Sequence, residues 1–242
     1  MPSALGPLFQ REFLGYFRGL VAYVFLAIFI LAVTGLAWFV GGFFQGNDAS
    51  LRTFFIFLPW VYLLFIPAVG MRLWAEERRS GTWELLFTYP LGVGQAVLAK
   101  FLAAWAFISL ALLGTFTMAL TVNYLGEPDW GPIFAGYFGA VLMAGSFLAI
   151  CSLASALTRS QVIAFVLSVS VCFVLLMLGW SVGNQLMLGL GFPVWLVDAL
   201  ANFSFIPHFD PMTKGLITLG DVLFFGVLIG FCLWVNTVVL ER

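Results

Sequence analysis

Few residues in this sequence could do chemistry. Its one histidine, His208, stands beside Asp210 in a loop segment that also contains Pro207 and Pro211. A histidine next to an acid can act as a base or a ligand, but a lone histidine between prolines is more often structural. The sequence has no HExxH, GxSxG or CxxC motif and no glycine-rich sequence of the kind that binds nucleotide phosphates. We therefore expect no enzymatic activity, no metal site and no cofactor in this chain.

The three cysteines give no other site. Cys151, Cys172 and Cys232 all lie inside apolar runs, with no close pair among them. This pattern is typical of small buried hydrophobic residues rather than of metal ligands or a disulfide framework.

Charge is instead concentrated in one stretch, RLWAEERRSGTWELLFTYP, which runs from Arg72 to Pro90 between two apolar runs. The EERR cluster is expected to continue the preceding helix by a turn before Ser80 and Gly81 break it. Thr82 can then cap a short helix, roughly Trp83 to Thr88. A plain connector is the alternative, but it has little use for a capped helix with so much apolar surface. The segment therefore predicts a docking element in the aqueous phase.

The composition defines the fold class. The 242 residues are 63% hydrophobic and only 9% charged, against about 25% charged in soluble domains. We predict an all-α integral membrane protein, a single transmembrane domain over 1–242. A net charge of −1 without a basic run gives no reason to expect nucleic acid as a partner. The expected parts are a surface helix at 3–19, spans at 20–40, 54–73, 97–124, 133–157, 162–182 and 216–240, a charged loop at 74–90, and a longer loop at 183–215 with a short helix from Val194 to Phe203.

The surface helix is predicted by its amphipathic pattern, with Leu5, Leu8 and Phe9 at helical spacing ahead of further aromatic residues. Glu12 falls close to the apolar stripe. Two explanations stay open, a partner on that face or a contact with another protein.

Two features of the spans predict close packing. Pro59 and Pro67 lie inside the second span and are candidate hinge positions, with a harmless bend as the alternative. The fourth span repeats small residues at helical spacing, including Gly136 and Ala140, which permits close helix approach.

Basic residues predict the orientation. With the N-terminus in the cytoplasm, eight of the ten lysines and arginines fall on the cytoplasmic side, and only Arg52 and Lys214 fall outside. Both termini and the charged loop are then cytoplasmic.

No charged residue lies in the middle of a span, where each would cost roughly 2.5–3.5 kcal/mol on insertion scales. Asp221, near the start of the last span, is expected to act as a helix cap. A carrier driven by protons or sodium is therefore not expected, and energy for transport has to come from a partner through the charged loop.

The sequence around this loop resembles the permease subunits of type 2 ABC exporters, most closely the branch associated with gliding motility. The matching region covers about 54–101, and Lys100 follows the motif ten residues on. Arg11, Glu12 and Phe13 resemble the start of the family's surface helix. The motif residues are Pro67, Ala68, Met71, Arg72, Glu76, Glu77, Gly81, Thr82, Glu84, Leu85, Leu86 and Pro90.

The resemblance implies a six-span subunit of the bacterial inner membrane that pairs with a second copy or a close relative. It also implies a cytoplasmic ATPase dimer, which binds the ATP and Mg. In many such systems it further implies an auxiliary membrane-anchored protein on the outer side, for which Asp198, His208 and Asp210 of the 183–215 loop are the expected contacts. By the resemblance, the loop after the second span is the coupling helix. The implied ATPase contacts are Glu76, Glu77, Arg78, Arg79, Gly81, Thr82, Trp83, Glu84, Leu85 and Leu86, the charged ones at the rim and Trp83, Leu85 and Leu86 as buried anchors.

Two functions remain open after this reading. The first is a permease for export. The alternative is a mechanotransmission subunit, which drives an outer partner without moving a substrate across the membrane.

Overall fold

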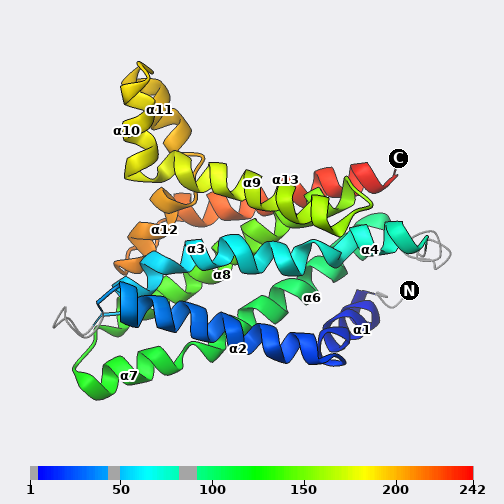
Figure 1. Cartoon of the computed structure of the whole chain (residues 1–242), viewed down its shortest axis with the longest axis horizontal. Coiled ribbons are helices and arrows are strands. Elements are labelled where there is room, and N and C mark those ends of the chain that lie inside the picture. The colour runs from blue at the N-terminus through cyan, green and yellow to red at the C-terminus, as the bar shows by residue number, and fades with distance from the viewer. Residues whose placement is uncertain (1–4, 43–49, 82–91, 242) are drawn as a thin grey trace.

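The computed structural model describes residues 5–42, 50–81 and 92–241, and every regular element in these ranges is a helix. Six helical segments of the described chain are long and apolar enough to cross a membrane. This agrees with the predicted number of spans. They run nearly side by side, and the two chain ends lie at the same end of the bundle (Figure 1). We call this the terminal end and the other the opposite end.

The first half of the chain supplies a surface helix and three spans. The helix α1 (Leu5–Phe17) packs on the start of α6, and α2 (Leu20–Gly35) follows and ends in a π-helical turn, Leu36–Val40. The second span consists of α3 (Arg52–Gly70) and α4 (Arg72–Ser80). The third consists of α6 (Val93–Gly114) and α7 (Thr117–Leu125).

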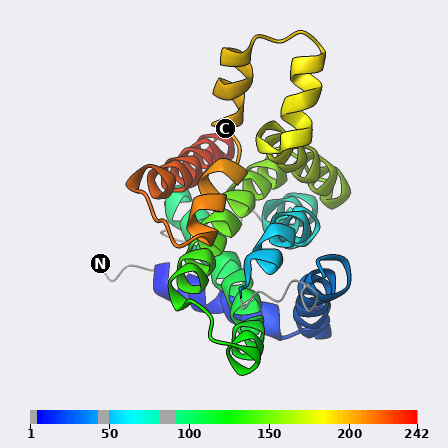
Figure 2. The same cartoon turned by 90° about the vertical axis from the view of Figure 1, so that its left-hand side faces the viewer.

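The second half begins with the central helix of the bundle, α8 (Trp130–Ala156), which packs against α3, α6, α9, α12 and α13. The fifth span is α9 (Gln161–Gly179) and the last is α13 (Leu219–Glu241). Between them lie three short helices, α10 (Ser181–Gly189), α11 (Val194–Ala201) and α12 (Ile206–Thr213). The pair α10 and α11 projects sideways from the bundle at the opposite end (Figures 1 and 2).

Close packing around α8 depends on its glycines, as the small-residue pattern predicts. A Cβ added to Gly136 would lie 2.4 Å from the ring of Phe55, and one added to Gly139 would lie 2.6 Å from Sδ of Met212. Because real atoms do not approach so closely, these positions fix how near α3 and α12 come to α8.

Some predicted boundaries differ from the helices observed. The helix of the second span continues beyond residue 73 through the EERR cluster to Ser80 and ends at Gly81, as the sequence predicts. The third span was expected to be one helix over 97–124. It starts earlier, at Val93, and is interrupted after Gly114, where the hydroxyl of Tyr137 donates a 3.0 Å hydrogen bond to the carbonyl of Thr115.

The 183–215 loop contains more helix than the single segment expected. The observed α11 ends at Ala201, two residues before the predicted end, and α10 and α12 are additional. Pro207 and Pro211 do not bracket an open loop, since both lie within α12. Pro207 is tolerated there because it occupies the first turn, where a backbone N–H has no helical acceptor.

Candidate functional site

The charged residues of α4 lie at the terminal end of the bundle. Glu76 and Arg79 are exposed, while Glu77 and Arg78 are partly buried. Gly81 ends the helix in the left-handed conformation, with φ of 72°, which glycine adopts without strain. The remaining residues proposed for the ATPase contact lie outside the described residues. They are Thr82, Trp83, Glu84, Leu85 and Leu86.

A buried lysine connects this charged helix to the rest of the terminal end. The side chain of Lys100, in the second turn of α6, is only 5% exposed, and its Nζ lies 2.7 Å from Oε1 of Glu77. The same Nζ lies 3.4 Å from Oε2 of Glu12 on α1 and 5.4 Å from the centre of the Trp74 ring. Lys100 therefore joins α1, α4 and α6 at one point.

The surface helix takes part through Glu12, which also pairs with the exposed Arg11 at 2.8 Å. Burial opposes ionisation of Glu12, but Lys100 and Arg11 together outweigh it and hold the pKa of this carboxyl below its usual value. On the next turn, burial and then the charge of Glu12 raise the pKa of the Tyr16 hydroxyl well above its usual value. Of the two explanations for Glu12, the structure confirms a charged partner on the apolar face.

A serine of α8 fixes the junction between α3 and α4. Oγ of Ser155 accepts hydrogen bonds from the backbone N–H groups of Trp74 (3.1 Å) and Ala75 (3.0 Å), and donates one to the carbonyl of Met71 (2.9 Å). These three bonds use the full capacity of a hydroxyl. Ser155 therefore stabilises the end of the second span through backbone groups, whatever the side chains around it.

A second serine, one turn earlier, joins three spans. Oγ of Ser152 accepts a 3.2 Å hydrogen bond from Nε1 of Trp74 and a 2.7 Å bond from Nδ2 of Asn236 on α13. All three side chains are buried. The two serines together form a polar clip, Ser152 and Ser155, which holds α4 on α8.

Close approach of the backbones makes this clip possible. A Cβ added to Gly70 would lie 2.4 Å from Cβ of Cys151, one helical position before Ser152. The candidate hinge residues Pro59 and Pro67 are both buried inside α3, and the interruption of the helix falls four residues after Pro67, at Met71. No contact tests whether either proline acts as a hinge, so that role stays a prediction.

The residues proposed for an outer contact lie at the opposite end. Nδ1 of His208 lies 2.8 Å from Oδ1 of Asp221, and its Nε2 lies 3.0 Å from the backbone oxygen of Asn202. Asp210 is paired with Lys214, the residue just after α12, and Asp198 is exposed on α11. His208 and Asp210 thus have partners within the chain. Contact of these residues and Asp198 with another protein stays a prediction.

The cap of α13 is Thr218 rather than the expected Asp221, which is the third residue of the helix. The backbone N–H of Asp221 donates a 3.2 Å hydrogen bond to Oγ1 of Thr218, whose hydroxyl donates in return to Oδ2 of Asp221 at 2.7 Å. This reciprocal pair stabilises the first turn of α13.

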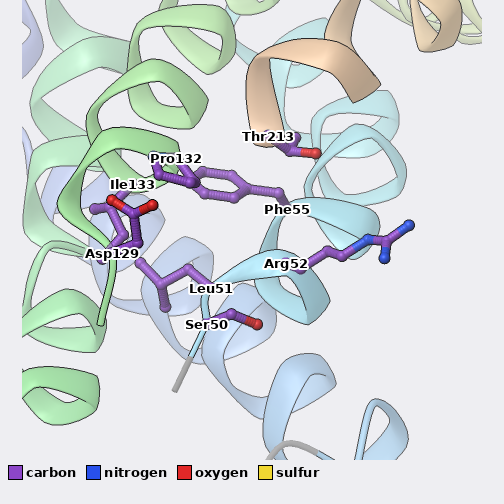
Figure 3. A pocket seen from close by; sticks show the side chains of 8 residues that line it. All are labelled: Ser50, Leu51, Arg52, Phe55, Asp129, Pro132, Ile133 and Thr213. Atoms are coloured by element: carbon purple, nitrogen blue, oxygen red, sulfur yellow. The ribbon is translucent and has the colours of Figure 1, made fainter. Parts of the chain in front are cut away.

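Two hollows lie near the opposite end. The smaller, of about 70 Å³, lies between the start of α3 and the start of α8 (Figure 3). Asp129 borders it and accepts a hydrogen bond from the Gly131 N–H, while the guanidinium of Arg52 extends away from Asp129. The larger, of about 200 Å³, is lined mainly by apolar side chains, among them Trp60 and Trp180. Neither contains a set of groups that could catalyse a reaction.

Cysteine, histidine and acidic side chains of the described chain form no cluster of three that could hold a metal. The three cysteines are buried and unbridged, as the sequence predicts.

The sequence prediction did not assign a role to the residues that organise the terminal end, namely Lys100, Ser152, Ser155 and Asn236. One signal was available for Lys100, since a lysine a turn or two inside an apolar helix needs a partner. No comparable signal marks the serines, because serine is common among small residues in transmembrane helices.

Comparison with known proteins defines the class. Residues 42–223 match the family described as "ABC-2 family transporter protein". The chain therefore belongs to the ABC-2 transporter family, as a multi-pass membrane protein of the permease type.

Two curated relatives carry the name "Probable ABC transporter permease protein NosY". The chain is 33% identical over 146 residues to the one from Pseudomonas aeruginosa, which covers 55% of this chain and 51% of the relative. It is 32% identical over 135 residues to the one from Stutzerimonas stutzeri, covering 50% and 46%. The matched region thus spans about half the length of each relative. Placement in the gliding-motility branch stays a prediction.

Proposed function

We propose that this chain is the membrane subunit of an ATP-driven exporter, and that it couples ATP hydrolysis by a separate cytoplasmic ATPase dimer to export across the bacterial inner membrane. The observation that carries the proposal is the position of α4 and its attachment to the bundle. The helix presents the exposed charges of Glu76 and Arg79 at one end of the bundle, leads directly into 82–91, and is held on α8 by Ser155.

The rigid attachment of α4 supports a role in passing force. A displacement applied to residues 82–91 would reach α3 through its junction with α4 at Met71, and α8 through the polar clip. Packed helices shift as units rather than deforming locally, so a small movement at one end would alter the arrangement of the spans. The ATP and Mg would be bound by the partner and not by this chain.

The positions of the lysines and arginines support a cytoplasmic location for the terminal end. Arg52 and Lys214 are the basic residues expected on the outer side, and they lie at the start of α3 and just after α12, at the opposite end. The other eight belong to the terminal end by sequence. The rule that basic residues stay inside then places α1, α4 and both termini in the cytoplasm.

A second permease copy, or a close relative, would complete the transport path. The apolar side chains of α2, α9 and α13 are largely exposed, unlike those of α8. Lipid accounts for part of this surface, and a two-fold partner would cover the rest.

The proposal is tested by binding. A tagged chain with Glu84→Lys and Leu85→Glu should lose an ABC ATPase that co-purifies with the wild type, because both an ionic and an apolar contact are removed. The matched control carries Leu125→Glu and Glu127→Lys, two exposed positions at the opposite end, and should retain the ATPase. Equal retention by both variants would contradict the proposal.

The mechanotransmission alternative gains no support from the family description, which is that of a transporter. In proteoliposomes, an ATPase rate stimulated by an outer protein but by no transported compound would favour it instead.

A further inference from the structure

Charged side chains lie around Lys100, although packing of the helices alone would not require charged residues there. Among the described residues, Arg11, Glu12, Lys100 and Glu77 form a chain of ion pairs in which cations and anions alternate. Burying an ion pair is costly, and apolar side chains of the same size often stabilise a protein at least as well. A buried pair is better suited to fix one arrangement of the elements that it joins.

The cluster joins elements that share few other contacts. The helix α1 packs on α6, and α4 packs on α8 and α9. Across this gap, the ammonium of Lys100 is the group that contacts carboxylates from both α1 and α4. Its aliphatic stem is enclosed, since the side chain is only 5% exposed, and the Trp74 ring lies against the charge. Lys100 therefore has little freedom to reach other partners.

We infer that Lys100 is a positioning residue, which makes the surface helix α1 move together with α4 when the coupling segment is displaced. The motion at the end of the second span would then reach the membrane surface through Glu77, Lys100 and Glu12 in turn. This inference rests on the proposed function for the source of the motion, but the link between α1 and α4 is a property of this chain.

Both carboxylates lie within ion-pair distance of the ammonium, Glu77 at 2.7 Å and Glu12 at 3.4 Å. Oε2 of Glu77 is buried and has no hydrogen-bond partner among the described residues. When α4 shifts, Oε2 can replace Oε1 as the acceptor for the Lys100 ammonium.

The test measures the distance between α1 and α4 directly. Spin labels are placed at the exposed positions Gln10 and Ser80, after Gln10→Cys and Ser80→Cys, because neither residue is among the expected ATPase contacts. The permease and its ATPase are reconstituted in lipid nanodiscs, without nucleotide and with ATP and vanadate. With Lys100 present we expect one narrow distance distribution, the same in both states. In Lys100→Met we expect loss of the narrow component and a distance that depends on nucleotide, while Lys100→Arg restores the narrow component.

The matched control is Lys214→Met, which removes a lysine paired with one acid at the opposite end, and it should leave the distribution unchanged. Where Lys100→Met fails to fold, Glu12→Gln keeps the pair of Lys100 with Glu77 and should still broaden the distribution. A narrow, unchanged distribution in the Lys100→Met or Glu12→Gln variant would overturn the inference. If the wild type binds no ATPase, the proposed function fails, and the nucleotide-free comparison alone decides the inference.

Discussion

Nδ2 of Asn236 in the last helix donates a 2.7 Å hydrogen bond to Oγ of Ser152 in the central helix. Both side chains are buried, and Ser152 also accepts from Nε1 of Trp74. Since hydrogen bonds between membrane helices average only about 0.6 kcal/mol and reach about 1.7, the bond is expected to orient the helices more than to stabilise them.

A double-mutant cycle tests this bond. Ser152→Ala and Asn236→Ala should show a coupling energy of about 0.6 kcal/mol in thermal unfolding of the detergent-solubilised chain. The coupling arises because each single substitution already removes the shared bond. Strictly additive effects would show that the two residues do not interact in solution.

Ser155 is expected to contribute more. Ser155→Ala leaves the backbone N–H groups of Trp74 and Ala75 without their acceptor in a buried site, which should lower the free energy of unfolding by about 1–3 kcal/mol. Ser146→Ala on the same helix is the control, because the hydroxyl of Ser146 bonds only the carbonyl of Leu142 on its own helix. Equal melting temperatures for the two variants would be inconsistent with the clip.

Much of this architecture follows from the sequence, but the contacts that organise the terminal end do not. Six apolar runs and the charged stretch after the second predict the number of spans, and the misplaced Glu12 predicts a partner of some kind. Which residue that partner is depends on how α1 lies against α6, a tertiary relationship that no local pattern contains. The same holds for Ser152 and Ser155, because an amphipathic period is weak in helices that are apolar all round.

The interruptions of the helices were missed for a related reason. Gly114 and Thr115 are both tolerated inside a membrane helix, so the sequence favours one continuous span. The break is stabilised from outside by the hydroxyl of Tyr137, which bonds the freed carbonyl. Similarly, prolines read as loop residues in the 183–215 segment, although Pro207 is suited to the first turn of a helix.

The packing of α3 on α8 can be tested at Gly70. Gly70→Ala should destabilise the chain by about 1–3 kcal/mol because its Cβ would overlap that of Cys151. Gly226→Ala on α13, where no atom lies within 4 Å, should be neutral or slightly stabilising. Adding Cys151→Gly to the first variant should recover part of the loss in thermal unfolding. If Cys151→Gly recovers no stability, overlap of the two Cβ atoms is not the cause of the destabilisation by Gly70→Ala.

The Glu12 pair predicts a pH dependence. The pKa of Glu12 lies below its usual value of 4.5, so the unfolded state binds its proton at a higher pH than the folded state does. The pair therefore stabilises the docking of α1 fully above pH 4.5, and this contribution is lost as the pH falls through the folded pKa. The protection factors of the α1 amides, which correct the exchange rate for its intrinsic dependence on pH, should fall in this interval relative to their values at neutral pH.

Glu12→Gln is the control for that experiment. It cannot titrate, so the exchange of its α1 should exceed that of the wild type above pH 4.5 and approach it below. If the exchange rates of α1 in the two proteins differ by the same factor on both sides of pH 4.5, Glu12 is not the group whose titration weakens the docking of α1.

The orientation of the chain is the prediction on which the coupling role depends most. Arg79→Cys and Glu127→Cys place thiols at exposed positions at the two ends of the bundle, and the three native cysteines are buried, so background labelling should be low. In spheroplasts, a membrane-impermeant maleimide should label the cysteine at 127 and not the one at 79. In inverted vesicles the result should reverse, because the excess of basic residues at the terminal end favours the cytoplasm. Labelling of the cysteine at 79 from outside would place α4 beyond the reach of any cytoplasmic ATPase, and the coupling mechanism would have to be abandoned.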